Sequence, residues 1–501
     1  MEYLIGIDIG TSGTKTVLFD TNGAAVASVT REYPMYQPRI GWAEQNPQDW
    51  WEATHTSVSE VIHTSGVNSG DIKGIGLSGQ MHGLVMLDAE GNVLRPSIIW
   101  CDQRTAGECD EITDLVGRER LIDITANPAL TGFTASKIMW VKNNEPQIFE
   151  KCRKILLPKD YIRYMLTGEY ATEVSDASGM QLLDIANRKW SGEVLSRLGI
   201  DRALLSEVHE PCVISAKVSK KAAALTGLKE GTPVAGGAGD QAAGAVGNGI
   251  VREGLISSTI GTSGVVFAHT GRPVIDKGGR VHTFCHAVPN AWHVMGVTQA
   301  AGLSLKWFRD NFCASETETA KYMNIDPYVL MDKEAESVPA GSNGILYLPY
   351  LMGERSPHLN PDAKGVFFGL SAFHTKKDLL RAVMEGVGYS LKDCLNVLAE
   401  MGIKAAEVRA SGGGGKSGLW RRIQADMFGC NVSTTRSGDA GALGVAILAG
   451  VGTGIWSSVE EACGQVVKAE NAVAPSEENH IIYQHGYEKY AALYEHIKSL
   501  F

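Results

Sequence analysis

Hydrophobic and polar residues follow a strand pattern in some segments of this chain and a helix pattern in others. Short glycine-rich turns separate these segments. Near the N-terminus, apolar runs at residues 3–8 and 14–20 flank a Gly-Thr-Ser-Gly turn, which predicts two strands. A third strand is predicted after the Asn-Gly turn at 22–23. A helix is then predicted from a capping residue, Asn46, to a terminating glycine, Gly66. The order strand, turn, strand and crossover helix indicates an α/β fold.

The second half of the chain begins as the first half does. The letters IGTSG occur at 9–13 and again at 260–264, and strands are predicted on both sides of each copy. Residues 106–200 instead carry helical spacing. Matching strands around a shared turn favour duplication over chance. Because a single core stops growing at roughly 250–300 residues, we predict one domain at 1–250 and a second at 251–501.

Composition narrows the class of protein. The net charge of −10 argues against nucleic-acid binding, which rests on neutralising phosphates with Lys and Arg. The nine cysteines lie far apart with no CxxC pair, as is typical of reduced thiols in a cytoplasm. His282, Cys285 and His286 lie close together but do not complete a zinc set. The chain opens without a signal peptide pattern and has no apolar run of 18 residues, so we expect a cytoplasmic enzyme that does not enter a membrane.

The first IGTSG turn has the chemistry of an anion site. Its closely spaced N–H groups and two hydroxyls suit a nucleotide phosphate, and Lys15 adds a cation. Asp8, at the end of the preceding strand, can hold Mg²⁺ through water. The alternative is a hairpin whose glycines only allow the turn. The second copy has Thr259 where the first has Asp8, so a metal role belongs to the first copy.

Asp240 stands alone among glycines and alanines in GGAGDQAAGAVGNG. A carboxylate in a loop of such small residues can be approached closely by a substrate hydroxyl, as a general base requires. The alternative is an acidic cap for a helix that begins near Gln241. The two interpretations are compatible.

Two further segments allow more than one interpretation. The segment ASGGGGKS at 410–417 fits a loosened P-loop with Lys416, or a turn on which an adenosine ring lies flat. The turn Gln80, Met81 and His82 presents an amide, a thioether and an imidazole, which could line a sugar or polyol pocket. A histidine in such a turn is otherwise most often a surface residue.

Taken together, these motifs resemble the FGGY family of carbohydrate kinases over the full length of the chain. IGIDIGTSGTK and STIGTSGVV are similar to its two phosphate loops, GGAGDQAAGAVG to its catalytic loop, and SGGGGKSGLWRR to its adenosine loop. Residues 132–144 and 365–387 fit its two signature segments. The resemblance implies two actin-like ATPase domains, each on a ribonuclease H-like sheet, flanking a deep cleft.

The resemblance also implies roles for particular residues, with ATP and Mg²⁺ as cofactors and Asp240 and Asp8 as the catalytic pair. The nucleotide would be contacted by Thr11, Ser12, Gly13, Lys15, Thr262, Gly302, Lys306, Gly413 and Ser417. The sugar would be contacted by Gln80, Met81, His82, Trp100, Asp102, Asp240 and Gln241. This chain departs from the family pattern at Gly415-Lys416, where many members have Ala-Arg, and at Gln241, where some members have Asn.

The substrate is expected from the residues that follow Gln80. Glycerol-specific members of the family have Arg-Glu there, whereas members that phosphorylate D-xylulose have Met-His, as this chain does with Met81 and His82. Transfer of the γ-phosphoryl of ATP to D-xylulose is therefore the expected reaction. Ribulose, gluconate or glycerol as substrate, a P-loop enzyme and a non-enzymatic actin-like binding protein are the alternatives. A homodimer is common in the family.

Overall fold

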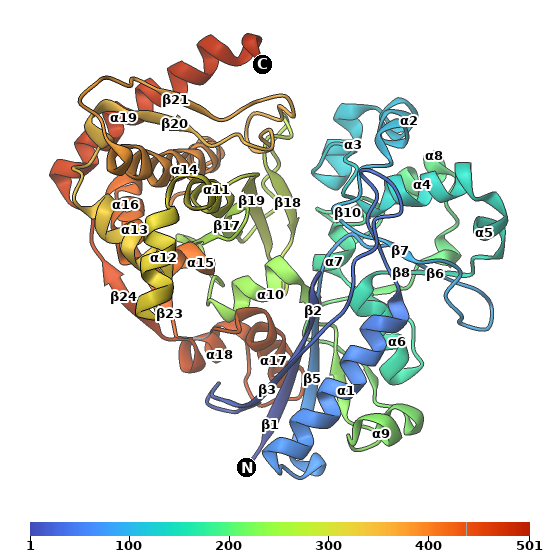
Figure 1. Cartoon of the computed structure of the whole chain (residues 1–501). Coiled ribbons are helices and arrows are strands. Elements are labelled where there is room, and N and C mark those ends of the chain that lie inside the picture. The colour runs from blue at the N-terminus through green and yellow to red at the C-terminus, as the bar shows by residue number, and fades with distance from the viewer. Residues whose placement is uncertain (437) are drawn as a thin grey trace.

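The computed structural model describes residues 1–436 and 438–501, which form two lobes (Figure 1). The first lobe is built on a seven-stranded sheet in the order β13-β14-β5-β1-β2-β3, with β15 beside β5. These strands are β1 (Tyr3–Ile9), β2 (Gly13–Asp20), β3 (Ala25–Glu32), β5 (Ile72–Gly79), β13 (Ile214–Lys217), β14 (Pro233–Ala235) and β15 (Ala238–Gly239). The three N-terminal strands and α1 (Pro47–Ser65) confirm the predicted order. Asn46 accepts a hydrogen bond from the N–H of Gln48, and Gly66 ends α1 at φ 65°.

The second lobe repeats this arrangement. Its seven strands run in the order β18-β19-β17-β16-β22-β23-β24. They are β16 (Leu255–Ile260), β17 (Gly264–Thr270), β18 (His282–Cys285), β19 (Trp292–Thr298), β22 (Glu407–Ser411), β23 (Asn431–Thr435) and β24 (Ala469–Val473). Strand β16 pairs antiparallel with β17 and parallel with β22, just as β1 pairs with β2 and β5. The two IGTSG turns therefore occupy equivalent places in two similar sheets, as duplication predicts.

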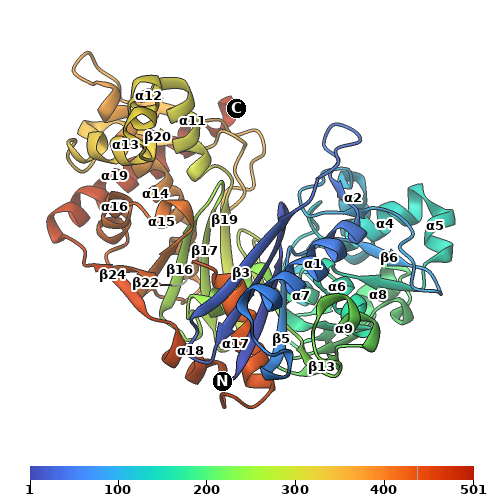
Figure 2. The same cartoon turned by 60° about the horizontal axis from the view of Figure 1, so that its bottom comes forward.

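Helices cover both sheets. In the first lobe α1, α6 (Pro158–Thr167) and α9 (Lys220–Thr226) pack on one face. The second lobe is covered by α11 (Gly302–Phe312), α12 (Ala314–Met323), α13 (Pro327–Glu336), α14 (Lys376–Glu400), α16 (Gly418–Phe428) and α19 (Glu477–Ile497). Figure 2 shows these helices beside the second sheet, away from the first lobe.

The helical spacing predicted at 106–200 corresponds to a subdomain of the first lobe with its own buried cluster. It contains α2 (Ala106–Val116), α3 (Arg118–Thr125), α4 (Thr134–Asn144), α5 (Pro146–Lys151), α7 (Val174–Ser178) and α8 (Gly192–Leu198). Short strand pairs complete it: β4 (Glu44–Gln45) with β7 (Ser97–Ile98), β6 (Val85–Leu87) with β8 (Lys154–Leu156), β9 (Ala171–Glu173) with β12 (Glu207–His209), and β10 (Leu183–Asp184) with β11 (Lys189–Trp190).

One helix from the second half of the chain packs on the first sheet. Helix α17 (Ala440–Gly452) lies against β1, β5 and α10 (Asp240–Gly247), and Figure 1 shows it at the bottom of the view with α18 (Val459–Val466). The approach is so close that a Cβ on Gly6 or Gly76 would lie 1.9 Å from a carbonyl oxygen of α17. Glycine at these strand positions is therefore required by packing.

In the part of the chain that the structure describes, no helix combines the length and the apolar character needed to cross a membrane.

Candidate functional site

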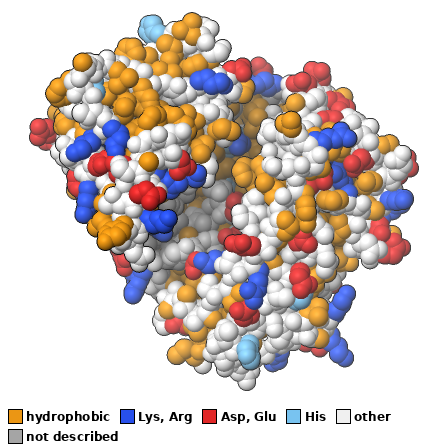
Figure 3. All heavy atoms as spheres, in the orientation of Figure 1, with side chains coloured by type: hydrophobic (Ala, Val, Ile, Leu, Met, Phe, Trp, Pro, Cys, Tyr) orange, Lys and Arg blue, Asp and Glu red, His pale blue; other side chains and the backbone are white. Residues whose placement is uncertain are grey.

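The larger of two adjoining cavities lies between the lobes and the smaller one lies within the second lobe, and Figure 3 shows the surface hollowed between the lobes. The larger, of about 770 Å³, is lined by Asp240 and Gln241 on one side and by the glycine-rich segment after β22 on the other. The smaller, of about 410 Å³, lies beside the second IGTSG turn. Gly413 and Lys416 line both cavities, so the two cavities are neighbours. An elongated ligand with a polar end and a flat apolar end fits such a pair of cavities.

Asp240 lies at the first position of α10, directly after the glycine-rich loop. Its Oδ1 accepts a hydrogen bond of 2.7 Å from the N–H of Gln241, and the carboxylate also lines the larger cavity. Burial, with the charge of Asp8 as a second cause, raises the pKa of Asp240 to about 7. The side chain of Asp240 thus belongs to the first turn of α10 and also borders the larger cavity. A carboxylate with this pKa is suited to accept a proton near neutral pH.

Asp8 is half-buried near the end of β1, and desolvation is also the main reason that its pKa is raised. Across the β1–β2 ladder it stands opposite Lys15. Its Oδ1 has no hydrogen-bond partner among the described residues. A buried carboxylate oxygen without a partner is costly, and this oxygen therefore indicates a place for a ligand.

Asp439 joins this group from the far end of the sequence, and the sequence pattern did not identify it. It precedes α17 and forms an ion pair with Lys15, although 424 residues separate them. Helix α17 comes so close that a Cβ on Gly441 would lie 2.8 Å from Oδ2 of Asp8. Lys15, predicted as a phosphate contact, therefore already has a carboxylate partner.

The turn after β5 places Gln80 and Met81 in the interior and leaves His82 half-buried. The amide of Gln80 donates to Oε1 of Gln45 at 2.7 Å, and its own Oε1 is buried without a partner among the described residues. Met81 is 4% exposed and packs on Gly239, where an added Cβ would lie 2.8 Å from its Cγ. The turn is therefore in contact with the loop that carries Asp240.

His82 adopts φ 70°, and its Nδ1 lies 2.9 Å from the carbonyl oxygen of Gly179. Burial, with nearby Lys137, lowers the pKa of His82 to about 3, so the ring is neutral. Lys137 donates to the carbonyl oxygen of His82 at 2.9 Å. It lies on α4, in the segment 132–144 that the sequence analysis singled out without a residue role.

Trp100 and Asp102 are placed differently from each other. Trp100 donates from Nε1 to Oγ1 of Thr11 at 2.9 Å, so it contacts the first IGTSG turn. Asp102 is fully buried, where it accepts hydrogen bonds from Arg104 at 2.7 Å and from the N–H of Ala43 at 2.6 Å. The oxygens of Asp102 thus hold its own segment in place.

Five residues from separate segments, all predicted from the sequence to contact a nucleotide, come together in the second lobe. All five line the smaller cavity, and they are Thr262, Gly302, Lys306, Gly413 and Ser417. Ser417 also caps α16 by accepting from the N–H of Trp420 at 3.0 Å. Lys306 pairs with Asp310 at 2.7 Å on the same helix. Neither of the two cavities is lined by Thr11, Ser12 or Gly13.

The second lobe adds Arg355, another residue that the sequence analysis missed. The carboxylate of Glu354 accepts a hydrogen bond of 2.8 Å from the N–H of Arg355. The N–H of the next residue, Ser356, donates to the carbonyl oxygen of Val297 near the end of β19. Burial is the main cause that lowers the pKa of both His82 and His282, and the positive charge of Arg355 adds to it, so Arg355 lies within electrostatic range of the Gln80–His82 turn. The only signal in the sequence is the polar cluster GERSP after a buried strand.

Comparison with known proteins gives a consistent result. The N-terminal domain model of the FGGY family of carbohydrate kinases matches residues 3–247, and its C-terminal domain model matches residues 256–453. This chain belongs to the FGGY family of carbohydrate kinases. Its fold is accordingly the predicted pair of actin-like ATPase domains. As a carbohydrate kinase it takes ATP and a small carbohydrate as its partners.

Individual FGGY kinases match over the whole chain. The xylulose kinase of Bacillus subtilis (strain 168) is 40% identical over 503 residues, covering 100% of this chain and 98% of that protein. The gluconokinase of Bacillus licheniformis is 34% identical over 95% of this chain and 93% of that protein. The crystal structure of a kinase from Brucella ovis, titled as a xyloylose kinase, superposes with a TM-score of 0.92 at 35% identity, covering 100% of each chain.

FGGY membership also decides between the two interpretations of the segment at 410–417. Residues Gly412–Gly415 form a short helical turn, α15, and Gly412 is at φ 72°. The segment belongs to an actin-like fold, so the P-loop alternative is wrong. Lys416 lines both cavities but is not a P-loop lysine.

Proposed function

We propose that this FGGY kinase transfers the γ-phosphoryl of ATP to the terminal hydroxyl of D-xylulose, giving xylulose 5-phosphate. The observation that carries the transfer is Asp240, a carboxylate with a pKa near 7 that lines the cavity between the lobes. Met81 and His82 after Gln80, together with the xylulose kinases among the relatives, support the choice of sugar.

Asp240 acts as the general base in this proposal. The substrate oxygen forms a bond to the γ-phosphorus while the bond from phosphorus to the leaving ADP oxygen breaks, and Asp240 accepts the hydroxyl proton. The main contribution of the protein is positioning, because phosphoryl transfer needs little covalent chemistry from it. Gln241 and the Gln80–His82 turn would orient the sugar, and Trp100 would support the turn that contains Thr11. Asp102 would hold the Trp100 segment in place.

The residues around Asp8 fit Mg²⁺. The described residues contain no cluster of three or more His, Cys, Asp or Glu side chains suited to a metal, and Mg²⁺ bound to a nucleotide usually takes one or two carboxylates. The unpartnered Oδ1 of Asp8 is such a ligand. Mg²⁺ bound there would offset the negative charge of the phosphates. Asp8 would hold it directly or through water.

The nucleotide would lie along the two neighbouring cavities. The adenosine would occupy the smaller cavity against Gly302, Gly413 and Ser417, with Lys306 and Thr262 at its edge. The phosphates would extend toward Asp240 between the two IGTSG turns, where the N–H groups of Thr11, Ser12 and Gly13 and the hydroxyls of Thr11 and Ser12 would contact them. Lys15 would act through its ion pair with Asp439, as a fixed positive charge near Asp8.

An ADP-release assay over a panel of sugars tests the proposal. Turnover should be highest with D-xylulose, compared with D-ribulose, D-gluconate and glycerol. A higher kcat/KM with any of the other three compounds would show that this compound, and not D-xylulose, is the preferred substrate. Absence of sugar-dependent turnover with all four would instead support a non-enzymatic nucleotide-binding protein.

The pH dependence of activity should follow the protonation of Asp240. Because the base must be ionised and its pKa is raised to about 7, kcat/KM for the sugar should fall about tenfold per pH unit below 7 and level off above it. Initial rates between pH 5 and 9, at saturating ATP, measure this. An acid limb with its midpoint near pH 4, the ordinary range of a carboxylate, would contradict the assignment.

Replacing Lys416 by alanine should raise the KM for ATP by about threefold to tenfold and leave kcat nearly unchanged. Its side chain borders the cavities as a partly exposed cation, and a solvated charge contributes little. Steady-state kinetics with varied ATP measure the effect. A fall in kcat of about a hundredfold or more would show a direct role of Lys416 in the transfer step.

We place the protein in the cytoplasm, where its nine cysteines, all free in the structure, would remain reduced. The possible homodimer of the family can be checked by size-exclusion chromatography with light scattering.

A further inference from the structure

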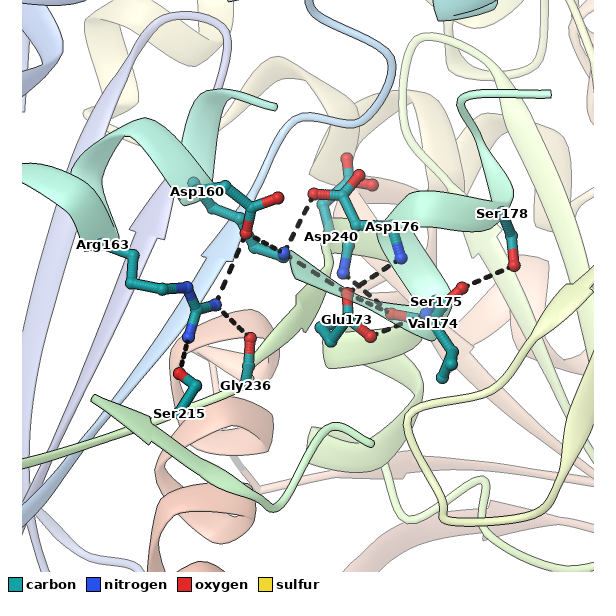
Figure 4. A network of polar contacts seen from close by, with 12 residues as sticks. Asp160, Arg163, Glu173, Val174, Ser175, Asp176, Ser178, Ser215, Gly236 and Asp240 are labelled. Atoms are coloured by element: carbon teal, nitrogen blue, oxygen red, sulfur yellow. Dashed lines mark hydrogen bonds and ion pairs between the residues drawn. The ribbon is translucent and has the colours of Figure 1, made fainter. Parts of the chain in front are cut away.

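Five charged side chains are buried together beneath the loop that carries Asp240, and Figure 4 shows their contacts. None is more than 1% exposed, and they are Lys159, Asp160, Arg163, Glu173 and Asp176. The Nζ of Lys159 lies 2.8 Å from Asp160, 3.4 Å from Glu173 and 3.3 Å from Asp176. A buried ion network of this kind contributes little net stability compared with apolar packing. The contacts that this network makes with the neighbouring backbone therefore say more about its role than its contribution to stability does.

Arg163 holds the segment that leads into the loop. Its guanidinium donates to the carbonyl oxygens of Ala235 at 2.8 Å and Gly236 at 2.5 Å, at the end of β14. The same group lies 3.5 Å from Asp160. Charge-assisted hydrogen bonds to two consecutive carbonyls fix the direction in which the chain leaves the strand.

Ser175 holds the other end of the segment. Its Oγ accepts a hydrogen bond of 3.1 Å from the N–H of Gly239, the residue directly before Asp240. The same hydroxyl donates to Oε1 of Glu173 at 2.9 Å. Glu173 in turn faces Lys159, so a continuous chain of contacts joins the buried charges to the backbone of the loop.

The cluster also reaches the sugar side of the site. Lys159 packs beneath Gly79, the last residue of β5 before Gln80, where an added Cβ would lie 3.2 Å from the Cβ of Lys159. Gly239 itself packs against Met81. The loop with Asp240 and the turn with Gln80 therefore rest on the same buried group.

We propose that Ser175 and Arg163, fixed by this buried charge network, are positioning residues that set the place of the Asp240 carboxylate for phosphoryl transfer. The inference rests on the proposed role of Asp240 as general base. Neither residue is expected to touch the substrate. Their effect is exerted through the backbone of residues 235–239.

Ser175→Ala tests the proposal, and Ser178→Ala is its matched control. Both serines are buried on α7. Ser178 donates to the carbonyl of Val174 at 2.6 Å and accepts from the N–H of Cys285 at 3.1 Å, with no hydrogen bond to the loop. A purely structural role of α7 would affect both variants alike.

We expect kcat of Ser175→Ala to fall about tenfold to a hundredfold with KM for sugar and ATP within about twofold, because small displacements of a reacting group lower the rate steeply. The acid limb of the pH profile should also move to lower pH, since a loosened loop hydrates Asp240. Ser178→Ala should stay near wild type. Equal losses in both variants, or a kcat of Ser175→Ala within twofold of wild type, would overturn the proposal.

Arg163→Lys tests the other end of the segment, and it remains a test of the proposal if Ser175→Ala does not fold. The lysine side chain retains the positive charge but lacks the planar guanidinium that reaches two carbonyl oxygens. We therefore expect kcat to fall in the same way as in Ser175→Ala. Thermal unfolding followed by circular dichroism checks that the variant is folded. Wild-type kcat in folded Arg163→Lys would overturn the proposal. Activity of Asp240→Ala, measured separately, tests the general base itself, so the two ideas can fail independently.

Discussion

Asp240→Ala is expected to lower kcat for sugar phosphorylation by about 10²–10⁴-fold, the usual contribution of a positioned general base. The carboxylate is the described group at which the cavity, the glycine-rich loop and a pKa near 7 coincide. Measurements of kcat at saturating sugar and ATP are sufficient. Survival of more than about a hundredth of the wild-type rate would show that Asp240 is not the base.

Asp240→Asn separates the chemistry from the fold. It retains shape and removes the charge, so the rate should fall as in Asp240→Ala, whereas Asp114→Asn on the exposed face of α2 should be without effect. The folded pKa of Asp240 is raised above its unfolded value, so stability is lost as pH rises from about 4 to 7. Asp240→Asn should therefore unfold at a higher temperature than wild type at pH 8, with a smaller difference at pH 5.

Asp8→Asn is expected to lower kcat by about a hundredfold and to raise the Mg²⁺ concentration needed for half-maximal rate by at least tenfold. The buried Oδ1 of Asp8 has no hydrogen-bond partner among the described residues, and an amide is a much weaker ligand for Mg²⁺ than a carboxylate. Rates over a Mg²⁺ titration at fixed ATP measure both effects. An unchanged Mg²⁺ midpoint would remove Asp8 from the metal site.

The same substitution has a second consequence at Asp240. The charge of Asp8 contributes to the raised pKa of Asp240, so removing it should move the acid limb of the pH profile to lower pH. A matched substitution that spares Asp8, Asp114→Asn, should leave the limb in place. An unmoved limb in Asp8→Asn would show that the two carboxylates are not coupled in solution.

Local chemistry made much of the fold predictable. The strands around each IGTSG turn, the helix between Asn46 and Gly66, and the helical segment at 106–200 follow from apolar periodicity and from capping residues, which act over a few residues. The repeated turn also predicted two similar sheets. The place of Asp240 near a helix start was predicted for the same reason, although α10 begins at Asp240 itself and its N-cap is Gly239.

Contacts across the chain could not be predicted in this way. Asp439 reaches Lys15 from 424 residues away, and the charge of Arg355, from the other lobe, adds to the effect of burial in lowering the pKa of His82. Arg163 and Ser175 resemble ordinary polar residues in sequence, and only burial makes their partners obligatory. Asp102, predicted as a sugar contact, is fully buried with Arg104 and the N–H of Ala43 as partners, which periodicity cannot reveal.

The sequence by itself thus determined the family and the duplicated α/β architecture, and it singled out Asp240 as the proposed base, since each depends on short motifs with their own local chemistry. Only the tertiary structure decided how that carboxylate is charged and held. The pKa of Asp240 depends on burial and on Asp8, which lies on β1, far away in the sequence. Its position depends on helix α7 and on a charge network beneath it, because desolvation and long-range hydrogen bonds arise only when distant segments pack together.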